Sequence, residues 1–138
     1  MTGAVHASIG AGIGRLFKNK GAAFLAGVAS HLLTDALPHK DFSPKLEAPL
    51  MAGALLAIGM WRGAHSPEFW GAMGAVAPDL EHGLLVTGLI EQQQEVFPSH
   101  IDDGKLHGRE TDERLSQFLL AGASLLALAL SPPREDPR

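Results

Sequence analysis

Charge-poor segments separated by polar turns constrain the fold of this chain more than any other feature of its sequence. The segments cover residues 21–34, 48–61, 69–77, 83–90 and 115–133, and proline, glycine and charged residues gather between them. No stretch alternates apolar and polar residues in the way that a half-buried strand does. The sequence therefore predicts an all-α protein.

The prolines and the turns set the limits of the helices. Pro38 should end a helix, because proline has no N–H and clashes with the preceding turn, and Pro49 suits the first turn of the next one. The predicted helices cover residues 3–17, 22–37, 49–62, 67–90 (interrupted around Pro78) and 114–130. The expected architecture is one domain, residues 1–131, folded as an up-and-down bundle of about five helices. Residues 132–138 are predicted to form a disordered tail.

The low charge of these segments raises the question of a membrane. Charged residues make up 19% of the chain, and it contains 16 glycines. A spanning helix needs about 20 mostly apolar residues, and only residues 115–133 approach this length without an ionisable group. We expect a multi-pass bundle embedded in a membrane, with the first helix as an anchor and the N-terminus facing away from the cytoplasm. A soluble cytoplasmic bundle with a core of small residues is the alternative.

Charge and cysteine content narrow the classes of function. A net charge of −4 and a pI of about 5.9 argue against a nucleic-acid partner, which would require a basic face. The chain has no cysteine, so disulfides, thiolate metal sites and cysteine nucleophiles are excluded. Any metal would have to be bound by imidazole and carboxylate groups, which suit zinc, manganese, iron or nickel.

The segment SHLLTDALPH places two histidines and an aspartate at four-residue spacing near the end of the second predicted helix. His31 and Asp35 share one face of this helix, because residues four apart lie about 40° from each other. A carboxylate at Asp35 meets the negative end of the helix dipole, which is unfavourable unless a cation lies nearby. We interpret His31, Asp35 and His39 as metal ligands. The alternatives are a lysine as the cation, or a buried histidine hydrogen-bonded to an aspartate.

Two further groups of ionisable residues follow along the chain. In the segment APDLEH, Asp79 and His82 are three residues apart and share a helix face, although proline followed by acids is also ordinary chemistry at a helix N-terminus. The polar segment PSHIDDGKLHGR contains His100, His107 and Arg109. It could close over a metal or an anionic group, or it could be a plain solvated loop.

Short connections between antiparallel helices would bring these groups to one end of the bundle. The N-terminus, the loop after the second helix and the loop after the fourth helix then lie on the same side. Only His65 among the seven histidines falls at the other end. The converging histidines are His6, His31, His39, His82, His100 and His107.

These motifs resemble the membrane-bound metal-dependent hydrolase family of bacterial inner membranes. Its members carry a histidine near the start, a Pro-Asp-x-Asp-His element, a histidine-rich element and a His-Leu-Leu-x-Asp helix. The matching residues are His6 for the first element, Pro78, Asp79 and His82 for the second, and His31 and Asp35 for the last. In this chain Glu81 replaces the second aspartate, and the last element precedes the Pro-Asp element. A remoter likeness is to zinc-dependent phospholipase C and related single-strand nucleases, which use a His-x-x-x-Asp helix for a polynuclear zinc site.

The resemblance implies a metal-dependent hydrolase of the bacterial inner membrane. A divalent metal, zinc first and manganese second, would activate water against a phosphoester, with a membrane lipid or another small anionic ester as the substrate. Asp79 and Arg109 are the expected catalytic residues, and Arg109 would take up charge on the phosphoryl oxygens. The alternative is a non-enzymatic helical membrane protein with structural His/Asp contacts or a structural metal. The expected metal ligands are His6, His31, Asp35, His39, Asp79, His82, His100 and His107.

Overall fold

The computed structural model describes residues 1–97, 108, 111–112 and 114–132 of the chain. Its five α-helices are α1 (Gly3–Gly14), α2 (Lys20–Asp35), α3 (Pro44–Arg62), α4 (Pro67–Val86) and α5 (Leu115–Ala129), and a short 3₁₀ helix, η1, covers Gln92–Gln94. No β-strand occurs in these ranges. The prediction of an all-α protein is confirmed.

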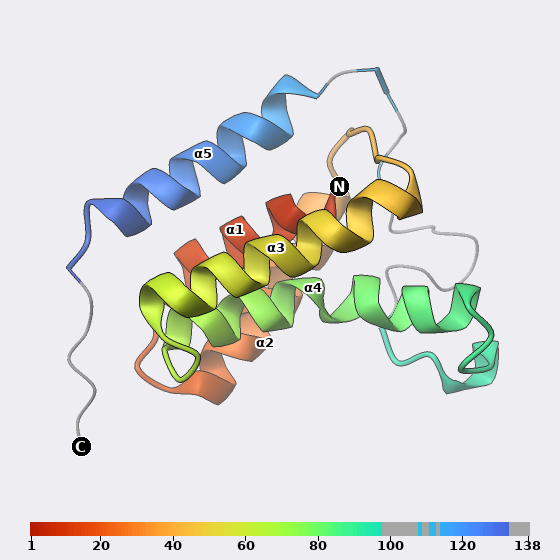
Figure 1. Cartoon of the computed structure of the whole chain (residues 1–138), viewed down its shortest axis with the longest axis horizontal. Helices are drawn as coiled ribbons and strands as arrows, with labels where there is room; N and C mark the ends of the chain where they lie inside the picture. Colours follow the sequence, from red (N-terminus) through yellow and green to blue (C-terminus); the bar gives the residue numbers. More distant parts are fainter. Residues whose placement is uncertain (98–107, 109–110, 113, 133–138) are drawn as a thin grey trace.

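Helix α1 lies at the centre of the bundle. Most of its residues are buried, and it packs against each of the other four α-helices. Helix α4 also packs against α2 and α3, and Figure 1 shows α2 and α5 on opposite sides of α1. Successive helices run in alternating directions, so the ends of α2 and α4 lie toward the end of the bundle where the chain begins (Figure 1).

Glycines allow α1, α2 and α4 to approach one another closely. A Cβ atom on Gly71 of α4 would lie 2.2 Å from the carbonyl oxygen of Gly10 in α1, and one on Gly27 of α2 would lie 2.1 Å from the carbonyl oxygen of Gly71. These distances leave no room for a side chain, because the opposing atoms belong to the backbone. Gly10 in the segment GAGIG of α1 and Gly27 in α2 therefore serve helix packing.

Two helices continue through prolines that the sequence places at boundaries. Helix α3 begins at Pro44 rather than at Pro49, because Ser43 takes the extended backbone of an N-cap. The Glu47 carboxylate also accepts a hydrogen bond from the backbone N–H of Phe42, with a distance of 2.8 Å. Helix α4 passes through Pro78 without interruption. Proline removes one hydrogen bond inside a helix, and the packing of α4 against three neighbours compensates for this loss.

Helix α5 packs against α1, and hydrogen bonds hold it near both of its ends. Near its start, the Gln117 side chain donates to the carbonyl oxygen of Lys40 at 2.9 Å. Beyond its last turn, Arg15 and Arg62 donate to the carbonyl oxygens of Pro132 and Ser131 at 3.3 and 3.2 Å. An open apolar groove of about 630 Å³ lies between α5 and α3. It is lined by Ser8, Ala54, Ala57, Ile58, Trp61, Leu125, Leu126 and Ala129.

Large apolar side chains are exposed on α2, α3, α4 and α5. Leu33 on α2 is 73% exposed, Met60 on α3 is 80% exposed and Leu126 on α5 is 59% exposed. Helix α5 buries only Gln117 and Leu128 among its fifteen residues. In the ranges that the structure describes, no helix combines the length and the hydropathy needed to cross a membrane.

Candidate metal centre

A cluster of buried histidines and aspartates occupies the end of the bundle where the chain begins. Helix α1 contributes His6, α2 contributes His31 and Asp35, α4 contributes Asp79, and the segment after α2 contributes His39. His6 and His31 are fully buried, and Asp35 and His39 are each 1% exposed. Polar side chains buried to this extent require partners or ligands, because they have lost their contacts with water.

His6, His31 and Asp79 form the core of this cluster. One donor atom from each residue lies within 4.8 Å of the donor atoms of the other two, which is close enough for a single ion to bind all three. The imidazole rings of His6 and His31 have centroids 4.0 Å apart, and Nε2 of His31 lies 4.0 Å from Oδ1 of Asp79. The three residues come from three helices that pack against one another, so the bundle itself sets their geometry.

The carboxylate of Asp35 lies between three imidazole rings. Its Oδ1 is 3.4 Å from Nε2 of His6 and 3.5 Å from Nε2 of His39, and its Oδ2 is 4.0 Å from Nε2 of His31. Asp35 is the last residue of α2, where the helix dipole disfavours a negative charge. The expected four-residue pattern of His31, Asp35 and His39 is thus brought together in space.

In each of the three imidazole rings, Nε2 is the nitrogen next to Asp35, and the other nitrogen, Nδ1, makes a hydrogen bond. Nδ1 of His31 donates to the carbonyl oxygen of Ala75 at 2.8 Å, and Nδ1 of His39 donates to that of Leu37 at 2.7 Å. Nδ1 of His6 lies 3.2 Å from the hydroxyl oxygen of Thr34, which accepts from it when the hydroxyl donates to the carbonyl oxygen of Ser30. In a neutral ring with its hydrogen on Nδ1, Nε2 keeps a lone pair, and in these three rings Nε2 is the nitrogen next to the carboxylates. Metal-binding histidines in proteins have this same outer contact.

Burial keeps His31 neutral at physiological pH. Loss of solvation, with a smaller effect from neighbouring His6, lowers the pKa of His31 from 6.5 to about 4, while Asp79 and Asp35 partly oppose this shift. A neutral imidazole is the form that binds a metal. Nε2 of His6 is also buried and has no hydrogen-bond partner among the described residues. Two lone pairs next to carboxylate oxygens are an arrangement that a cation would stabilise.

Three groups at this end escaped the sequence analysis as ligand candidates. The α-ammonium group of Met1 lies 2.5 Å from Oδ1 of Asp35 and 3.0 Å from Oδ1 of Asp41. Asp41 also lies 3.3 Å from Nε2 of His39. Burial raises the pKa of the Glu47 carboxyl above its ordinary value, and the charges of Asp41 and Asp79 add to this effect, although the hydrogen bond from Phe42 opposes it.

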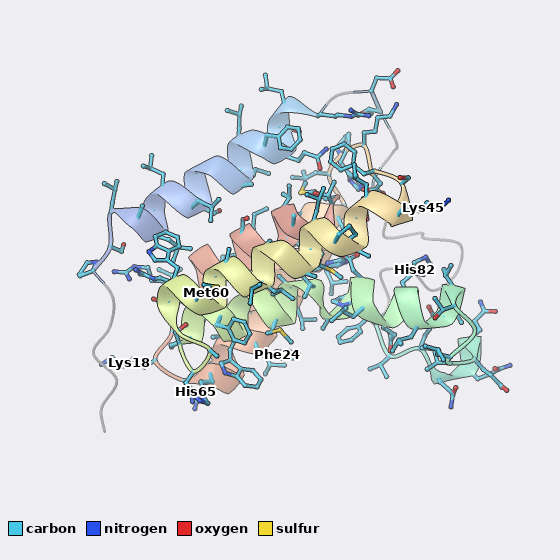
Figure 2. The ribbon with its side chains drawn as sticks, in the orientation of Figure 1. Lys18, Phe24, Lys45, Met60, His65 and His82 are labelled. Carbon is cyan, nitrogen blue, oxygen red and sulfur yellow. The ribbon has the colours of Figure 1, made fainter. Side chains whose placement is uncertain are left out.

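Among the remaining histidines, the structure describes the positions of His82 and His65. His82 is located further along α4 and does not belong to the group formed by His6, His31 and Asp79 (Figure 2). His65 lies at the opposite end of the bundle, as predicted (Figure 2). His100, His107 and Arg109 fall outside the residues that the structure describes.

A distant part of the chain fastens the segment that contains Asp35 and His39. The backbone N–H of Gly108 donates to the carbonyl oxygen of Asp35 at 2.6 Å, and that of Thr111 donates to His39 at 3.0 Å. A Cβ atom on Gly108 would lie 2.2 Å from the carbonyl oxygen of Leu37, so only glycine fits at this position. These contacts hold the end of α2 and the residues after it in place.

Comparisons of the chain with protein-family models, with curated proteins and with solved structures gave no match. The class of protein is therefore defined by fold and site alone. It is an all-helical bundle with a buried cluster of histidines and aspartates that could hold a metal ion.

Proposed function

We propose that this protein is a metal-dependent hydrolase whose metal is bound by His6, His31 and Asp79. The observation that carries the proposal is the convergence of one ring nitrogen from each of two buried histidines and one oxygen of the partly buried Asp79 carboxylate, all within 4.8 Å of one another. Asp35 and His39 lie beside this group and complete the donor set. The expected metal is zinc, with manganese as the second choice, because all the donors are imidazole nitrogens and carboxylate oxygens.

Asp79 is the member of this group best placed to meet a substrate. Its side chain is 22% exposed, whereas the side chain of His31 is fully buried. A bound divalent ion would supply a water molecule that ionises near neutral pH and would stabilise negative charge on the ester. Asp79 could then accept the proton from the attacking water, a role that requires hydrogen-bond reach to that water. Arg109 remains the proposed contact for the anionic oxygens of the substrate.

A phosphoester borne by a membrane lipid is the proposed substrate. Leu33, Met60 and Leu126 are examples of large side chains that remain more than half exposed on three different helices. Exposed apolar surface on this scale commonly marks an interaction with a protein or a membrane. A net charge of −4 would repel a nucleic acid, so a nucleic acid is less suitable than a lipid as the phosphodiester substrate. We therefore place the proposed activity at a bacterial inner membrane.

Metal analysis combined with an activity assay tests this proposal. Purified protein should contain at least one zinc or manganese ion per chain. It should hydrolyse generic phosphomonoester or phosphodiester substrates, lose this activity with a chelator and recover it with zinc or manganese. A His65→Ala variant is the control, because His65 lies at the opposite end of the bundle (Figure 2). Metal-loaded protein without turnover on phosphoesters, carboxylic esters and amides would rule out the enzyme.

A structural His/Asp centre is the second candidate, and the Met1 contact favours it. The α-ammonium group of Met1 lies against Asp35 and Asp41, so a cation other than a metal already offsets part of the acidic charge. In that case the cluster would stabilise the junction of α1, α2 and α4 without catalysis. Purified protein that lacks metal, fails to bind added zinc and remains fully folded would favour this second candidate.

A further inference from the structure

We infer that Thr34 is a positioning residue that determines which nitrogen of His6 faces the candidate metal centre. Thr34 lies on α2 one residue before Asp35, and its hydroxyl oxygen is 3.2 Å from Nδ1 of His6 on α1. The inference rests on the proposed function, because it gives Thr34 a role in the same metal centre.

The hydrogen bonds of Thr34 leave its hydroxyl only one way to contact His6. The hydroxyl donates its single hydrogen to the carbonyl oxygen of Ser30 at 2.8 Å, with the carbonyl oxygen of His31 at 3.3 Å as a weaker acceptor. A hydroxyl group has one hydrogen to donate, so toward His6 the oxygen can only accept. Nδ1 of His6 therefore carries a hydrogen in this arrangement, and Nε2 has its lone pair whenever the ring is neutral.

Nδ1 of His6, His31 and His39 each makes one of the hydrogen bonds described above. Of these three bonds, the one to Thr34 can be removed by a side-chain substitution. His31 and His39 donate to the backbone carbonyl oxygens of Ala75 and Leu37, which every substitution retains. Without the hydroxyl of Thr34, the hydrogen of His6 has a competing position on Nε2, where Oδ1 of Asp35 lies 3.4 Å away. A hydrogen in that position would occupy the lone pair that a metal requires.

The experiment compares two substitutions at Thr34 with a matched control. Thr34→Val removes the hydroxyl with little change in shape, and Thr34→Ser keeps it. The control is Thr87→Val, because the Thr87 hydroxyl donates in the same way to the carbonyl oxygens of Gly83 and Leu84 on α4. Two quantities are measured for each variant: the zinc affinity, and the position of the His6 hydrogen from the ¹⁵N signals of its ring in chelator-treated protein.

We expect Thr34→Val to move the hydrogen of His6 to Nε2 and to weaken zinc binding by about 10- to 100-fold, the usual effect of losing such an outer contact. Thr34→Ser should retain both wild-type properties, and Thr87→Val should match the wild type. The inference is overturned if Thr34→Val keeps the hydrogen on Nδ1 and binds zinc within about twofold of Thr87→Val. If Thr34→Val does not fold, Thr34→Ala takes its place with the same expectations.

The two measurements separate this inference from the proposed function. If the wild-type protein binds no zinc, the proposed metal centre fails, and the ¹⁵N signals of the metal-free protein still decide whether Thr34 positions His6. If zinc binds to the wild type and both substitutions at Thr34 leave the His6 ring unchanged, the metal centre stands and the role of Thr34 is refuted.

Discussion

Asp35 occupies an unfavourable position for a carboxylate, and its neighbours explain how the position is tolerated. It is the last residue of α2 and is 1% exposed, so it meets both the negative end of the helix dipole and the cost of burial. Three imidazole nitrogens and the Met1 ammonium group lie around it. A carboxylate enclosed in this way stabilises the folded protein only while its cationic or metal partner is present.

Loss of single donors should release the metal. We expect Asp35→Asn and His31→Ala each to lose most of the bound metal, because both residues face the centre of the cluster. Metal content per folded chain, measured by elemental analysis with circular dichroism as a check on folding, decides the outcome. His65→Ala should leave metal content unchanged. Full occupancy in either of the first two variants would show that the site has been placed wrongly.

Folding stability of the metal-free protein should decrease in acid because of His31. Its pKa is 6.5 ordinarily and about 4 in the folded chain, so between these values the unfolded chain takes up a proton that the folded chain does not. The free energy of unfolding should therefore fall as the pH decreases from about 6.5 to about 4, by about 3 kcal/mol in total from this residue. Urea titrations across this range measure it. His31→Gln should flatten the curve, and an equally steep curve in that variant would contradict the assignment.

At the scale of helices, the sequence predicted which segments are helical better than where each helix begins and ends. All five predicted helices are present, and each overlaps the predicted range. Pro49 and Pro78 suggested boundaries, yet both lie inside helices. A proline reports a local conformational preference, whereas contacts with distant helices decided the outcome here, and one sequence does not reveal those contacts.

The close contact of α1 and α4 should depend on the absence of a side chain at Gly71. We expect Gly71→Ala to destabilise the protein by about 1–3 kcal/mol, because its Cβ would lie 2.2 Å from a backbone oxygen that cannot move aside. Gly53→Ala is the control, since a Cβ at Gly53 of α3 would meet nothing within 4 Å. That change should be neutral or stabilise the helix by about 0.5–1 kcal/mol. Equal unfolding midpoints for the two variants would contradict this account.

For the molecule as a whole, chain direction was enough to predict which end carries the candidate site. Alternating helices bring His6, His31, His39 and Asp79 together, as the sequence analysis expected. The hydrogen bonds between His6 and Thr34 and between His31 and the carbonyl oxygen of Ala75 could not be predicted, because they depend on the rotation of α2 against its neighbours. The position of His82 could not be predicted for the same reason. Its three-residue spacing from Asp79 suggested a shared helix face, yet it does not belong to the group formed by His6, His31 and Asp79.

Exposed apolar side chains should make the whole protein bind lipid. We expect it to sediment with vesicles of phosphatidylcholine and phosphatidylglycerol, and we expect Leu119→Glu combined with Leu126→Glu on α5 to reduce this binding at least fivefold. These two side chains are 62% and 59% exposed, so the charges would face outward without disturbing the core. Gln92→Glu with Gln93→Glu adds the same charge to the exposed η1 helix and serves as control. Equal binding by both double variants would argue against a lipid-facing α5.

The contacts that fasten the candidate metal centre also determine when it can form during folding. Gly108 and Thr111 hold the residues at the end of α2, and the backbone N–H of Thr2 donates to the side chain of Gln117, 115 positions away along the chain. Contacts between such distant residues form late, because closing long loops costs conformational entropy before the contacts can compensate. On the ribosome, the helices before residue 98 would emerge with their histidines already made but without these contacts. The part of the centre formed by Asp35 and His39 would therefore be fixed only after residues 108 to 117 have emerged, whereas His6, His31 and Asp79 belong to helices that are complete before that point.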